Sequence, residues 1–530
     1  MAAAPGESVA RLHCRAQIGL TAPEVGVEVH LGSGLPTFSI VGLAATAVKE
    51  SKERVRAALV NSGFDFPAGR ITVNLAPADL PKDGGRFDLA IAVGILLASG
   101  QVRVPAAAAV PLDSTEFYGE LGLGGELRSV PGMLLAARCA QTAGRAVIVP
   151  LASAAETRLL PSAQVAAAAS LHAVCEHLRG RHALLAVEAI EPAAANGAPT
   201  PPDGLDSIIG QALGKRALVV AAAGGHSVLF VGPPGCGKTL LAQRLISLLP
   251  PLTAAEALEV ATIASVAGGG TAQMLPASGP RRPFRAPHHT ASASAIVGGG
   301  PKARPGDITL AHLGVLFLDE LPEFDRRVLE ALREPLESGV VSIARAQCHA
   351  EYPARFQLIA AMNPCDCGHL GDSLRACRCT PAQIARYRGR LSGPLLDRID
   401  LRVALQSVPE HEIAARESGR NPAAERDAGE ASRAGLRQRI RLARDRQLAR
   451  TGKLNAQLAA RELTESGNEF GMTSAALKVL AAARTALALS LRAQHRSLRV
   501  ARTIADLAGE DQISAAHAAE AIQLRRAFSA

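Results

Sequence analysis

Residues 232–239, GPPGCGKT, stand between the apolar run SVLFV and the leucine-rich segment LLAQRLISLLP. A glycine-rich turn between a strand and a helix lets backbone N–H groups surround phosphate oxygens, while its lysine reaches the β- and γ-phosphates and its threonine ligates Mg²⁺. The segment therefore predicts a phosphate loop that binds ATP and Mg²⁺. Its residues are Gly232, Pro233, Pro234, Gly235, Cys236, Gly237, Lys238 and Thr239.

Two later apolar runs end in polar residues that suit the same site. GVLFLDE places Asp319 and Glu320 after one run, and FQLIAAMN places Asn363 after the other. Asp319 is the expected second Mg²⁺ ligand, Glu320 could polarise the attacking water, and Asn363 could orient it. Short, almost continuous apolar runs are typical of parallel strands covered by helices on both faces. We therefore expect an α/β fold with a doubly wound parallel sheet.

Composition divides the chain into four segments. The Pro- and Ala-rich stretch 191–204 is typical of an exposed linker. Ahead of it, residues 1–190 mix strand-like runs with the apolar run LAIAVGILLA, which predicts a separate α/β domain. Residues 205–405 hold the predicted nucleotide site. From 406 to 530 the strands disappear, and Ala/Arg/Leu periodicity predicts a helical C-terminal domain.

Charge and aromatic content limit the partners that this chain can bind. The net charge is +9, and residues 401–530 alone hold 21 Lys and Arg against 14 Asp and Glu. The basic excess belongs to the C-terminal segment and admits a polyanionic partner. Aromatic residues make up only 3% of the chain, with no Trp, which argues against a protein that holds single strands mainly by base stacking. Contacts with a nucleic acid are therefore expected through Arg side chains and backbone groups.

The N-terminal twenty residues have no continuous apolar core behind a basic start, so they do not resemble a secretory signal. The longest charge-free run, between Arg216 and Lys238, is broken by glycines and prolines, which a membrane span tolerates poorly. Nine cysteines without an export signal favour reduced thiols or a metal site over a disulfide framework. We expect a cytoplasmic protein with no membrane partner.

Four of these cysteines form the pattern C-x-C-x9-C-x-C directly after Asn363. Two close pairs of thiolates could surround a tetrahedral Zn²⁺, although the spacing within each pair is tighter than is usual for zinc. The alternative is a set of reduced thiols in an Arg-rich loop. The candidate ligands of a structural Zn²⁺ are Cys365, Cys367, Cys377 and Cys379.

Basic residues gather in two further segments. The stretch between the phosphate loop and GVLFLDE is rich in glycine and proline, and SIARAQCHAEYPARF (342–356) resembles a hairpin. Arg and Lys on such loops suit phosphate contacts, which position a nucleic acid without reading its sequence. The neighbours His288 and His289 could instead ligate a metal or pack together. The candidate DNA contacts are Arg282, Arg285, His288, His289, Lys302, Arg304 and Arg345.

The order of these motifs resembles an AAA+ ATPase, with Asn363 in the sensor-1 position. GQALGKRALVVAAAGGH, RPFRAPHHTASASAIVGGG, GDITLAHLGVLFLDELPEF, MNPCDCG and SGPLLDRIDL together resemble the magnesium-chelatase-like branch and, more narrowly, the ComM/YifB family. The resemblance spans nearly the whole chain. It implies a helical C-terminal lid, a homo-oligomer of hexameric form, Arg398 as an arginine finger and Arg492 as the sensor-2 residue, with Arg496 as the alternative. The basic stretch ahead of GVLFLDE would face the pore of the ring.

The segment 81–100, PKDGGRFDLAIAVGILLASG, and the later RSVPGMLLAA are similar to the proteolytic domain of Lon, which has the ribosomal S5 domain 2-like fold. This resemblance places Arg86 at the position of the serine nucleophile and Leu134 at that of the lysine base. Arg has no nucleophilic oxygen and Leu cannot accept a proton. We therefore expect a catalytically dead domain with a scaffold or DNA-contacting role, in which Lys82 and Arg86 either touch phosphate or belong to a solvated loop.

The family resemblance implies an ATPase that drives a DNA helicase or translocase, promoting branch migration in natural transformation and homologous recombination. Its partner would be single-stranded and branched DNA, held by the backbone. The alternative is an AAA+ subunit that remodels a metal-chelatase or another protein partner. The Lon-like domain and the basic C-terminal segment favour DNA. Loss of the Ser-Lys pair disfavours an ATP-dependent protease.

Overall fold

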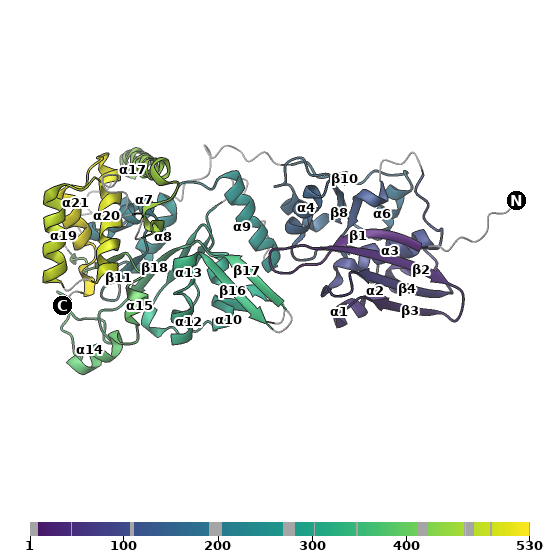
Figure 1. The fold of residues 1–530 in the computed structure, drawn as a ribbon, viewed down its shortest axis with the longest axis horizontal. Coiled ribbons are helices and arrows are strands. Elements are labelled where there is room, and N and C mark those ends of the chain that lie inside the picture. The colour runs from purple at the N-terminus through teal and green to yellow at the C-terminus, as the bar shows by residue number, and fades with distance from the viewer. Residues whose placement is uncertain are drawn as a thin grey trace.

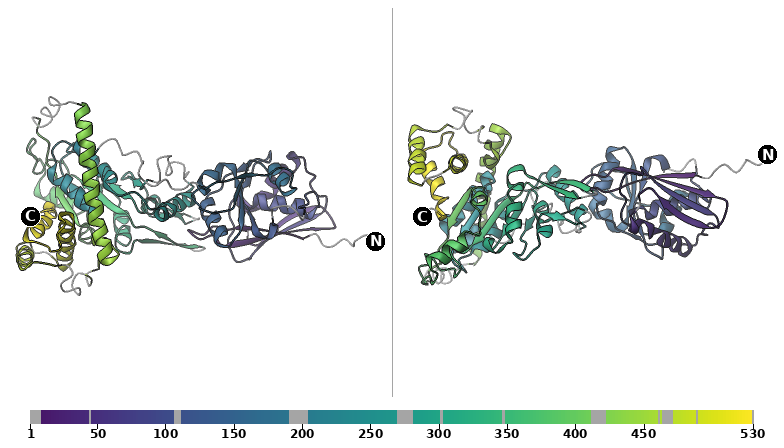
Figure 2. Two further views of the ribbon diagram at one scale, coloured as in Figure 1. Left: turned by 90° about the horizontal axis from the view of Figure 1, so that it is seen from above. Right: turned by 60° about the horizontal axis from the view of Figure 1, so that its bottom comes forward.

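Two bodies, each with its own β-sheet, lie along the long axis of the molecule, and the C-terminal helices pack at the end far from the N-terminus (Figures 1 and 2). The computed structural model describes residues 9–43, 45–105, 111–189, 204–268, 281–300, 303–345, 348–410, 422–459, 462, 471–487 and 490–528. Most of the predicted linker, residues 191–203, therefore lies outside the described residues.

The N-terminal body is built on an eight-stranded mixed sheet in the order β10-β9-β8-β5-β1-β2-β4-β3. Its strands are β1 (Val9–Arg15), β2 (Glu24–Gly32), β3 (Thr37–Val41), β4 (Arg70–Ala76), β5 (Thr115–Phe117), β8 (Ala146–Pro150), β9 (Val165–Ala168) and β10 (Leu185–Ala186), and a small hairpin joins β6 (Glu120–Leu121) to β7 (Leu127–Arg128). The helices are α1 (Thr46–Lys49), α2 (Ser51–Asn61), α3 (Asp88–Ala98), α4 (Met133–Thr142), α5 (Ala154–Thr157) and α6 (Leu171–Leu178).

The apolar run LAIAVGILLA forms α3, which is buried over Asp88–Leu96 and packs on β1 and β2. Gly94 permits this close approach, because a Cβ there would lie 2.5 Å from Cγ2 of Val29. A helix that is apolar on all sides is typical of the interior of a domain. The apolar run therefore forms the central helix of this body.

The second body contains a five-stranded sheet in the order β12-β15-β18-β11-β19, with every neighbouring pair parallel. The strands are β11 (Val228–Val231), β12 (Phe284–Arg285), β15 (Val315–Leu318), β18 (Gln357–Met362) and β19 (Leu401–Ala404). Alternate side chains pack on opposite faces: Phe230 and Phe317 join the cluster that includes α7 (Ala212–Gly224) and α8 (Lys238–Leu248), whereas Leu229 joins the cluster that includes α12 (Arg326–Ala331). The prediction of a doubly wound parallel sheet is confirmed.

Shorter elements surround this sheet. The antiparallel hairpins are β13 (Gly298–Gly299) with β14 (Arg304–Pro305), and β16 (Val340–Arg345) with β17 (Cys348–Pro353). The remaining helices of this body are α9 (Ala254–Ala267), α10 (Ala293–Ile296), α11 (Asp307–Leu310), α13 (Pro335–Ser338), α14 (Pro381–Arg388) and α15 (Gly393–Leu396).

The C-terminal segment is helical, as its periodicity predicted. It contains α17 (Pro422–Thr451), α19 (Ser474–Ala486), α20 (Leu491–Ala508) and α21 (Ala515–Gln523). Apolar residues of α20 share one core with α7 and α8, so the C-terminal helices form a lid packed on the five-stranded sheet. Within the described ranges, no helix combines the length and the apolar character that crossing a membrane requires.

The two bodies meet where α9 packs on α4. The backbone N–H of Gly132 donates to the carbonyl oxygen of Ser265 at 2.8 Å, and that of Leu134 donates to Ser265 Oγ at 3.3 Å. Ser265 is 4% exposed. The start of α4 is therefore covered by a helix of the second body.

Candidate nucleotide site

The phosphate loop follows β11 at the carboxyl edge of the parallel sheet and leads into α8, as predicted. Gly235 and Gly237 have φ angles of +79° and +89°, in the left-handed region that favours glycine. At Gly232 a Cβ would lie 2.8 Å from Sγ of Cys236 and 2.9 Å from the carbonyl oxygen of Leu405. The loop thus presents backbone N–H groups at the N-terminus of a helix, which is a site for phosphate.

Lys238 links this loop to the neighbouring strand. Its Nζ donates to the carbonyl oxygens of Gly232 and Pro233 at 2.7 and 2.9 Å, and to Oδ1 of Asn363 at 3.0 Å. Burial lowers the pKa of Lys238, an effect that the nearby acidic groups Asp319 and Glu320 oppose. Asn363, the predicted sensor residue, and Lys238, the predicted phosphate-binding lysine, are therefore in direct contact.

The two predicted Mg²⁺ ligands also lie together. Thr239 Oγ1 donates to Asp319 Oδ2 at 2.8 Å, and the second carboxylate oxygen of Asp319 accepts from the backbone N–H of Glu320 at 2.9 Å. A hydroxyl and a carboxylate are the hard oxygen ligands that Mg²⁺ takes beside nucleotide phosphates. This donor set fits the ion.

Glu320 has an unusual backbone and an unexpected partner. Its φ and ψ are +51° and +46°, which is uncommon for a residue with a side chain. Its carboxylate oxygen Oε2 lies 3.1 Å from Nδ1 of His289, and the side chain is 55% exposed. The sequence indicated both residues but not their pairing, because they are 31 positions apart and come from different loops.

The four cysteines after Asn363 converge. Their Sγ atoms all lie within 4.8 Å of one another, with separations of 3.4 Å between Cys365 and Cys367, 3.7 Å between Cys365 and Cys377, and 3.6 Å between Cys367 and Cys377. Tetrahedral zinc with Zn–S bonds of about 2.3 Å requires sulfur atoms about 3.8 Å apart. The thiols therefore fit a four-coordinate zinc ion.

This cysteine loop packs against the phosphate loop. A Cβ at Gly368 would lie 2.7 Å from Cδ of Pro234, and Gly368 has a φ angle of +84°. On its far side, Asp372 accepts from Ser407 Oγ at 2.9 Å and lies 3.0 Å from Nδ1 of His369. The loop that begins at Cys365 thus forms part of the wall behind the phosphate-binding turn.

The three arginines implied by the family resemblance have different surroundings. Nη2 of Arg398 lies 2.7 Å from Oε1 of Glu337, and the Arg398 side chain is 11% exposed. Arg496 donates to the carbonyl oxygen of Arg398 at 2.8 Å and to Asp400 Oδ1 at 2.6 Å. Arg492 is exposed in the first turn of α20. Arg496 is thus paired with Asp400 within the chain, and Arg398 as a finger and Arg492, or alternatively Arg496, as sensor 2 stay predictions.

Arg282 needs a correction. Its guanidinium donates to the carbonyl oxygens of Pro250 at 2.7 Å and Leu313 at 2.6 Å, and also lies 3.5 Å from Glu256. Burial lowers the pKa of this arginine. Because its guanidinium is bound to acceptors within the protein, Arg282 is not available to bind a phosphate of DNA.

The other basic candidates remain open. Arg285 is half-buried in β12, whereas His288 and Arg304 are exposed. The backbone of Arg345 ends β16, but its side chain lies outside the described part of the chain, as does Lys302 altogether. Contacts of these residues with DNA stay predictions.

The two positions that resemble the Lon dyad are enclosed. Arg86 is 6% exposed and donates to Gln17 Oε1 at 2.6 Å and to the carbonyl oxygen of Pro131 at 2.7 Å. Lys82 is fully buried against the carbonyl oxygen of Pro77, and Leu134 is fully buried in α4. The expectation that Lys82 and Arg86 either touch phosphate or lie in a solvated loop is therefore wrong. Both side chains are buried and donate hydrogen bonds to acceptors within the N-terminal body.

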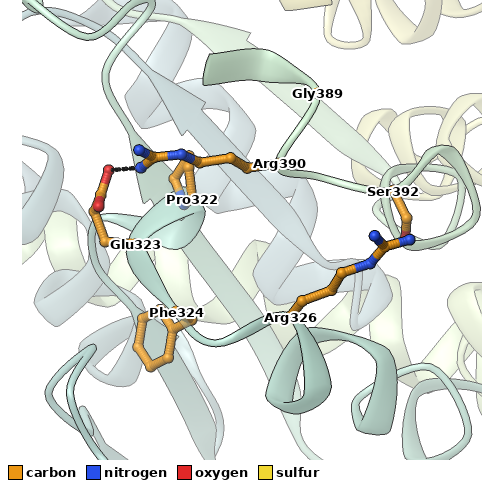
Figure 3. A pocket seen from close by; sticks show the side chains of 7 residues that line it. All are labelled: Pro322, Glu323, Phe324, Arg326, Gly389, Arg390 and Ser392. Carbon is orange, nitrogen blue, oxygen red and sulfur yellow. Dashed lines mark hydrogen bonds and ion pairs between the residues drawn. The ribbon is translucent and has the colours of Figure 1, made fainter. Parts of the chain in front are cut away.

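A separate pocket of about 460 Å³ lies beyond Glu320 and next to the end of α14 (Figure 3). Figure 3 shows Arg390 extended towards Glu323, with which it forms an ion pair. The pocket is lined by Pro322, Glu323, Phe324, Arg326, Gly389, Arg390 and Ser392. No residue of the phosphate loop lines it, so it is distinct from the nucleotide site.

Models of three protein families match successive parts of the chain. The model of the magnesium chelatase subunit ChlI matches residues 204–413, a second model of subunit ChlI of Mg-chelatase matches residues 27–153, and that of the ChlI C-terminal region matches residues 429–525. Each sheet-containing body and the helical lid thus has a counterpart in magnesium chelatase proteins.

Similar proteins extend this likeness to almost the full length. The chain is 47% identical over 518 residues to the protein YifB of Salmonella typhimurium, covering 98% of this chain and 97% of that one. It is 46% identical over 519 residues to the competence protein ComM of Haemophilus influenzae, with the same coverage. The magnesium-chelatase 38 kDa subunit of Rhodobacter capsulatus is 28% identical over 193 residues, which cover 34% of this chain and 55% of that subunit.

Proposed function

This chain belongs to the ComM/YifB family of magnesium-chelatase-like AAA+ ATPases, and from that premise we propose that it is a ring-forming, Mg-ATP-dependent DNA helicase or translocase. It promotes branch migration during natural transformation and homologous recombination. The observation that carries the ATPase part is the convergence of Lys238, Asp319, Glu320 and Asn363 at one edge of the sheet. The name of the Haemophilus relative, a competence protein, supports the link to incoming DNA.

Each residue of the site has a separate proposed role in ATP hydrolysis. The phosphate loop and Lys238 bind the triphosphate, and Thr239 and Asp319 hold Mg²⁺, which supplies neutralisation of the phosphate charge when bound. Glu320 accepts a proton from the attacking water, and Asn363 orients that water. Phosphoryl transfer depends mainly on positioning and on electrostatic stabilisation of the transition state. One subunit supplies all the groups that this requires except a positively charged side chain that stabilises the charge developing on the γ-phosphate.

We infer that Arg398 of an adjacent subunit supplies that charge in a homo-oligomeric, hexameric ring. In the single chain Arg398 forms an ion pair with Glu337. When two subunits dock, Arg398 must therefore leave Glu337 and bind the γ-phosphate of the nucleotide in the neighbouring subunit. A guanidinium supplied in this way is worth roughly 10³–10⁵ in rate. Arg492 on the lid is the proposed second arginine, acting on the nucleotide of its own subunit.

The proposed DNA partner is held through its backbone. Arg285, His288, His289, Lys302, Arg304 and Arg345 are the candidate contacts that remain after the removal of Arg282. The competing function is the remodelling of a metal-chelatase or another protein partner, which the likeness to the Rhodobacter subunit supports over about a third of the chain. The full-length likeness to ComM favours DNA.

The deciding experiment measures ATP hydrolysis and strand displacement with and without branched and single-stranded DNA. We expect DNA to stimulate the wild type, and we expect Lys238→Ala and Glu320→Gln to abolish both activities, because these changes remove phosphate binding and water activation. Lys453→Ala, which alters a surface lysine paired with Glu462, is the matched control and should behave as wild type.

Salt provides a second measurement on the same proteins. Binding through phosphates releases counterions, so affinity should fall steeply as salt rises from about 50 to 200 mM. If DNA neither binds nor stimulates the wild type even at low salt, the motor hypothesis fails and the protein-remodelling function takes its place.

We propose further that the four cysteines hold a structural Zn²⁺ that fixes the wall of the phosphate loop. The purified protein should contain about one zinc per chain, and Cys377→Ser should lose it, whereas Cys139→Ser, outside the cluster, should retain it. Because Gly368 touches Pro234, loss of zinc should also weaken the binding of a fluorescent ATP analogue. Metal analysis that finds no stoichiometric zinc in the wild type would defeat this proposal.

A further inference from the structure

Glu320 and Asn363, the residues proposed to activate and to orient the attacking water, extend from neighbouring strands. β15 and β18 are parallel, and their last paired residues are Leu318 and Ala360. The pairing of the two strands therefore ends before either residue that acts on the water is reached. The spacing between the two strand ends then depends on contacts outside the sheet, and an error of about 1 Å in such spacing slows a reaction strongly.

The end of α14 holds the segment that follows β18. Nε of Arg388 donates to the carbonyl oxygen of Pro364, the residue after Asn363, at 3.3 Å. Tyr387 is buried in the same cluster as Met362, the last residue of β18. Burial raises the pKa of Tyr387 to about 12, an effect that a hydrogen bond from the backbone of Asn363 opposes. The last turn of α14 thus contacts the chain next to the proposed sensor residue.

The residues just beyond α14 reach the segment that follows β15. Arg390 forms an ion pair with Glu323 (Figure 3), and its guanidinium carbon lies 5.7 Å from the centre of the Tyr387 ring. The backbone N–H of Glu323 donates to the carbonyl oxygen of Glu320 at 2.8 Å, so both residues belong to one turn. A cavity of about 460 Å³ lies beside this ion pair. The turn therefore has room to move if the pair is broken.

The start of α14 is fixed separately. Thr380 and Gln383 form a capping box, in which the backbone N–H of Thr380 donates to Gln383 Oε1 at 2.8 Å. Thr380 directly follows Cys379, whose Sγ accepts from the backbone N–H of Cys367 at 3.4 Å. Because the helix is anchored at its start, its end can hold both strand ends at a fixed spacing.

From these contacts we infer that the segment 387–390 is a brace across the ends of β15 and β18, and that Arg390 is a positioning residue that aligns Glu320 with Asn363. The inference rests on the roles proposed for these two residues in ATP hydrolysis and adds the device that keeps both on one water. Arg390 acts through Glu323 and the turn that begins at Glu320. The phosphate loop does not depend on this ion pair.

The expected effect is therefore on turnover and not on nucleotide binding. The side chains of Arg390 and Glu323 are 46% and 42% exposed, and an ion pair of this kind shifts an equilibrium by about two- to fivefold. Arg390→Ala should lower kcat for ATP by that factor in the absence of DNA. The dissociation constant for a fluorescent ATP analogue should stay within about twofold of wild type. Such a split indicates an interaction that matters in the transition state.

The test exchanges the two charges in the full-length protein. Arg390→Glu and Glu323→Arg each bring like charges together, so each should lower kcat more than Arg390→Ala does. The double variant restores opposite charges and should recover at least about half of the wild-type kcat. Arg128→Ala is the matched control, because it breaks an ion pair of the N-terminal body whose side chains are 60% and 48% exposed. It should keep the wild-type kcat.

A second comparison examines the other end of the brace. Tyr387→Phe removes only the hydroxyl and should lower kcat in the wild-type background. In the background of Asn363→Ala the same change should have no further effect, because residues that act as one unit are not additive.

Three results would overturn the inference. The first is a wild-type kcat for Arg390→Glu, and the second is a double charge variant that is no more active than the single variants. The third is a fall in kcat that is matched by weaker binding of the ATP analogue, since Arg390 would then support the phosphate loop. A wild type that hydrolyses no ATP would instead defeat the proposed function, and the inference with it.

Discussion

Asp400 links the five-stranded sheet to the lid. It is 3% exposed and is met by His226 Nδ1 at 3.0 Å and by Arg496 Nη1 at 2.6 Å, while Arg525 donates to its backbone carbonyl. Burial raises the pKa of such a carboxyl, but the hydrogen bond from His226 and the charges of Arg496 and Arg525 outweigh burial and lower it. One carboxylate therefore connects the start of β19 with α20 and the C-terminal end.

We predict that Asp400→Asn lowers the free energy of unfolding at pH 7 by about 3 kcal/mol, because it leaves buried arginines without a counter-charge. A depressed pKa contributes stability that is complete above the pKa of the unfolded carboxyl, about 3.9, and is lost as the pH falls below it. The difference in melting temperature between wild type and Asp400→Asn, measured by thermal unfolding, should therefore become smaller as the pH falls from 5 towards 3. Asp397→Asn, at a 41% exposed carboxylate, should cost less than about 0.5 kcal/mol.

Among the elements, α9 connects the second body with the N-terminal body. It begins with a capping box in which Thr253 Oγ1 accepts from the backbone of Glu256 and the Glu256 side chain accepts from the backbone of Thr253. It ends against α4 through Ser265. Burial raises the pKa of Glu156, whose side chain is hydrogen-bonded to the same serine. The covered start of α4 agrees with a scaffold role for the N-terminal body.

The phosphate loop, Asp319, Glu320 and Asn363 could be predicted from the sequence, because each is a local signal at the end of an apolar strand. The four cysteines were predicted in the same way, since their spacing alone brings them into one loop. Buried arginines could not be predicted. The carbonyl oxygens that enclose Arg86 and Arg282 come from distant loops, and an arginine in a Gly- and Pro-rich segment looks the same whether it faces solvent or the interior.

At the scale of the whole molecule, the placement of Arg398 predicts complementation between defective subunits. Lys238→Ala and Arg398→Ala should each be inactive alone, because one loses phosphate binding and the other the charge given to a neighbour. In a ring assembled from equal amounts of both, roughly one head-to-tail interface in four joins an intact phosphate loop to an intact arginine.

Such a mixed ring should therefore recover ATP hydrolysis, measured after co-expression or subunit exchange. Both variants should keep the oligomeric mass of the wild type, which sizing by light scattering checks. Mixed assemblies as inactive as the separate variants would show that Arg398 does not act across a subunit boundary.

The left-handed backbone of Glu320 has a consequence for how this chain tolerates change. A side chain at that φ and ψ costs about 1 kcal/mol or more, a penalty that glycine escapes. A sequence optimised for thermal stability alone would therefore place glycine after Asp319. The carboxylate at this position therefore costs the fold stability, a cost that we attribute to the role proposed for Glu320 in ATP hydrolysis.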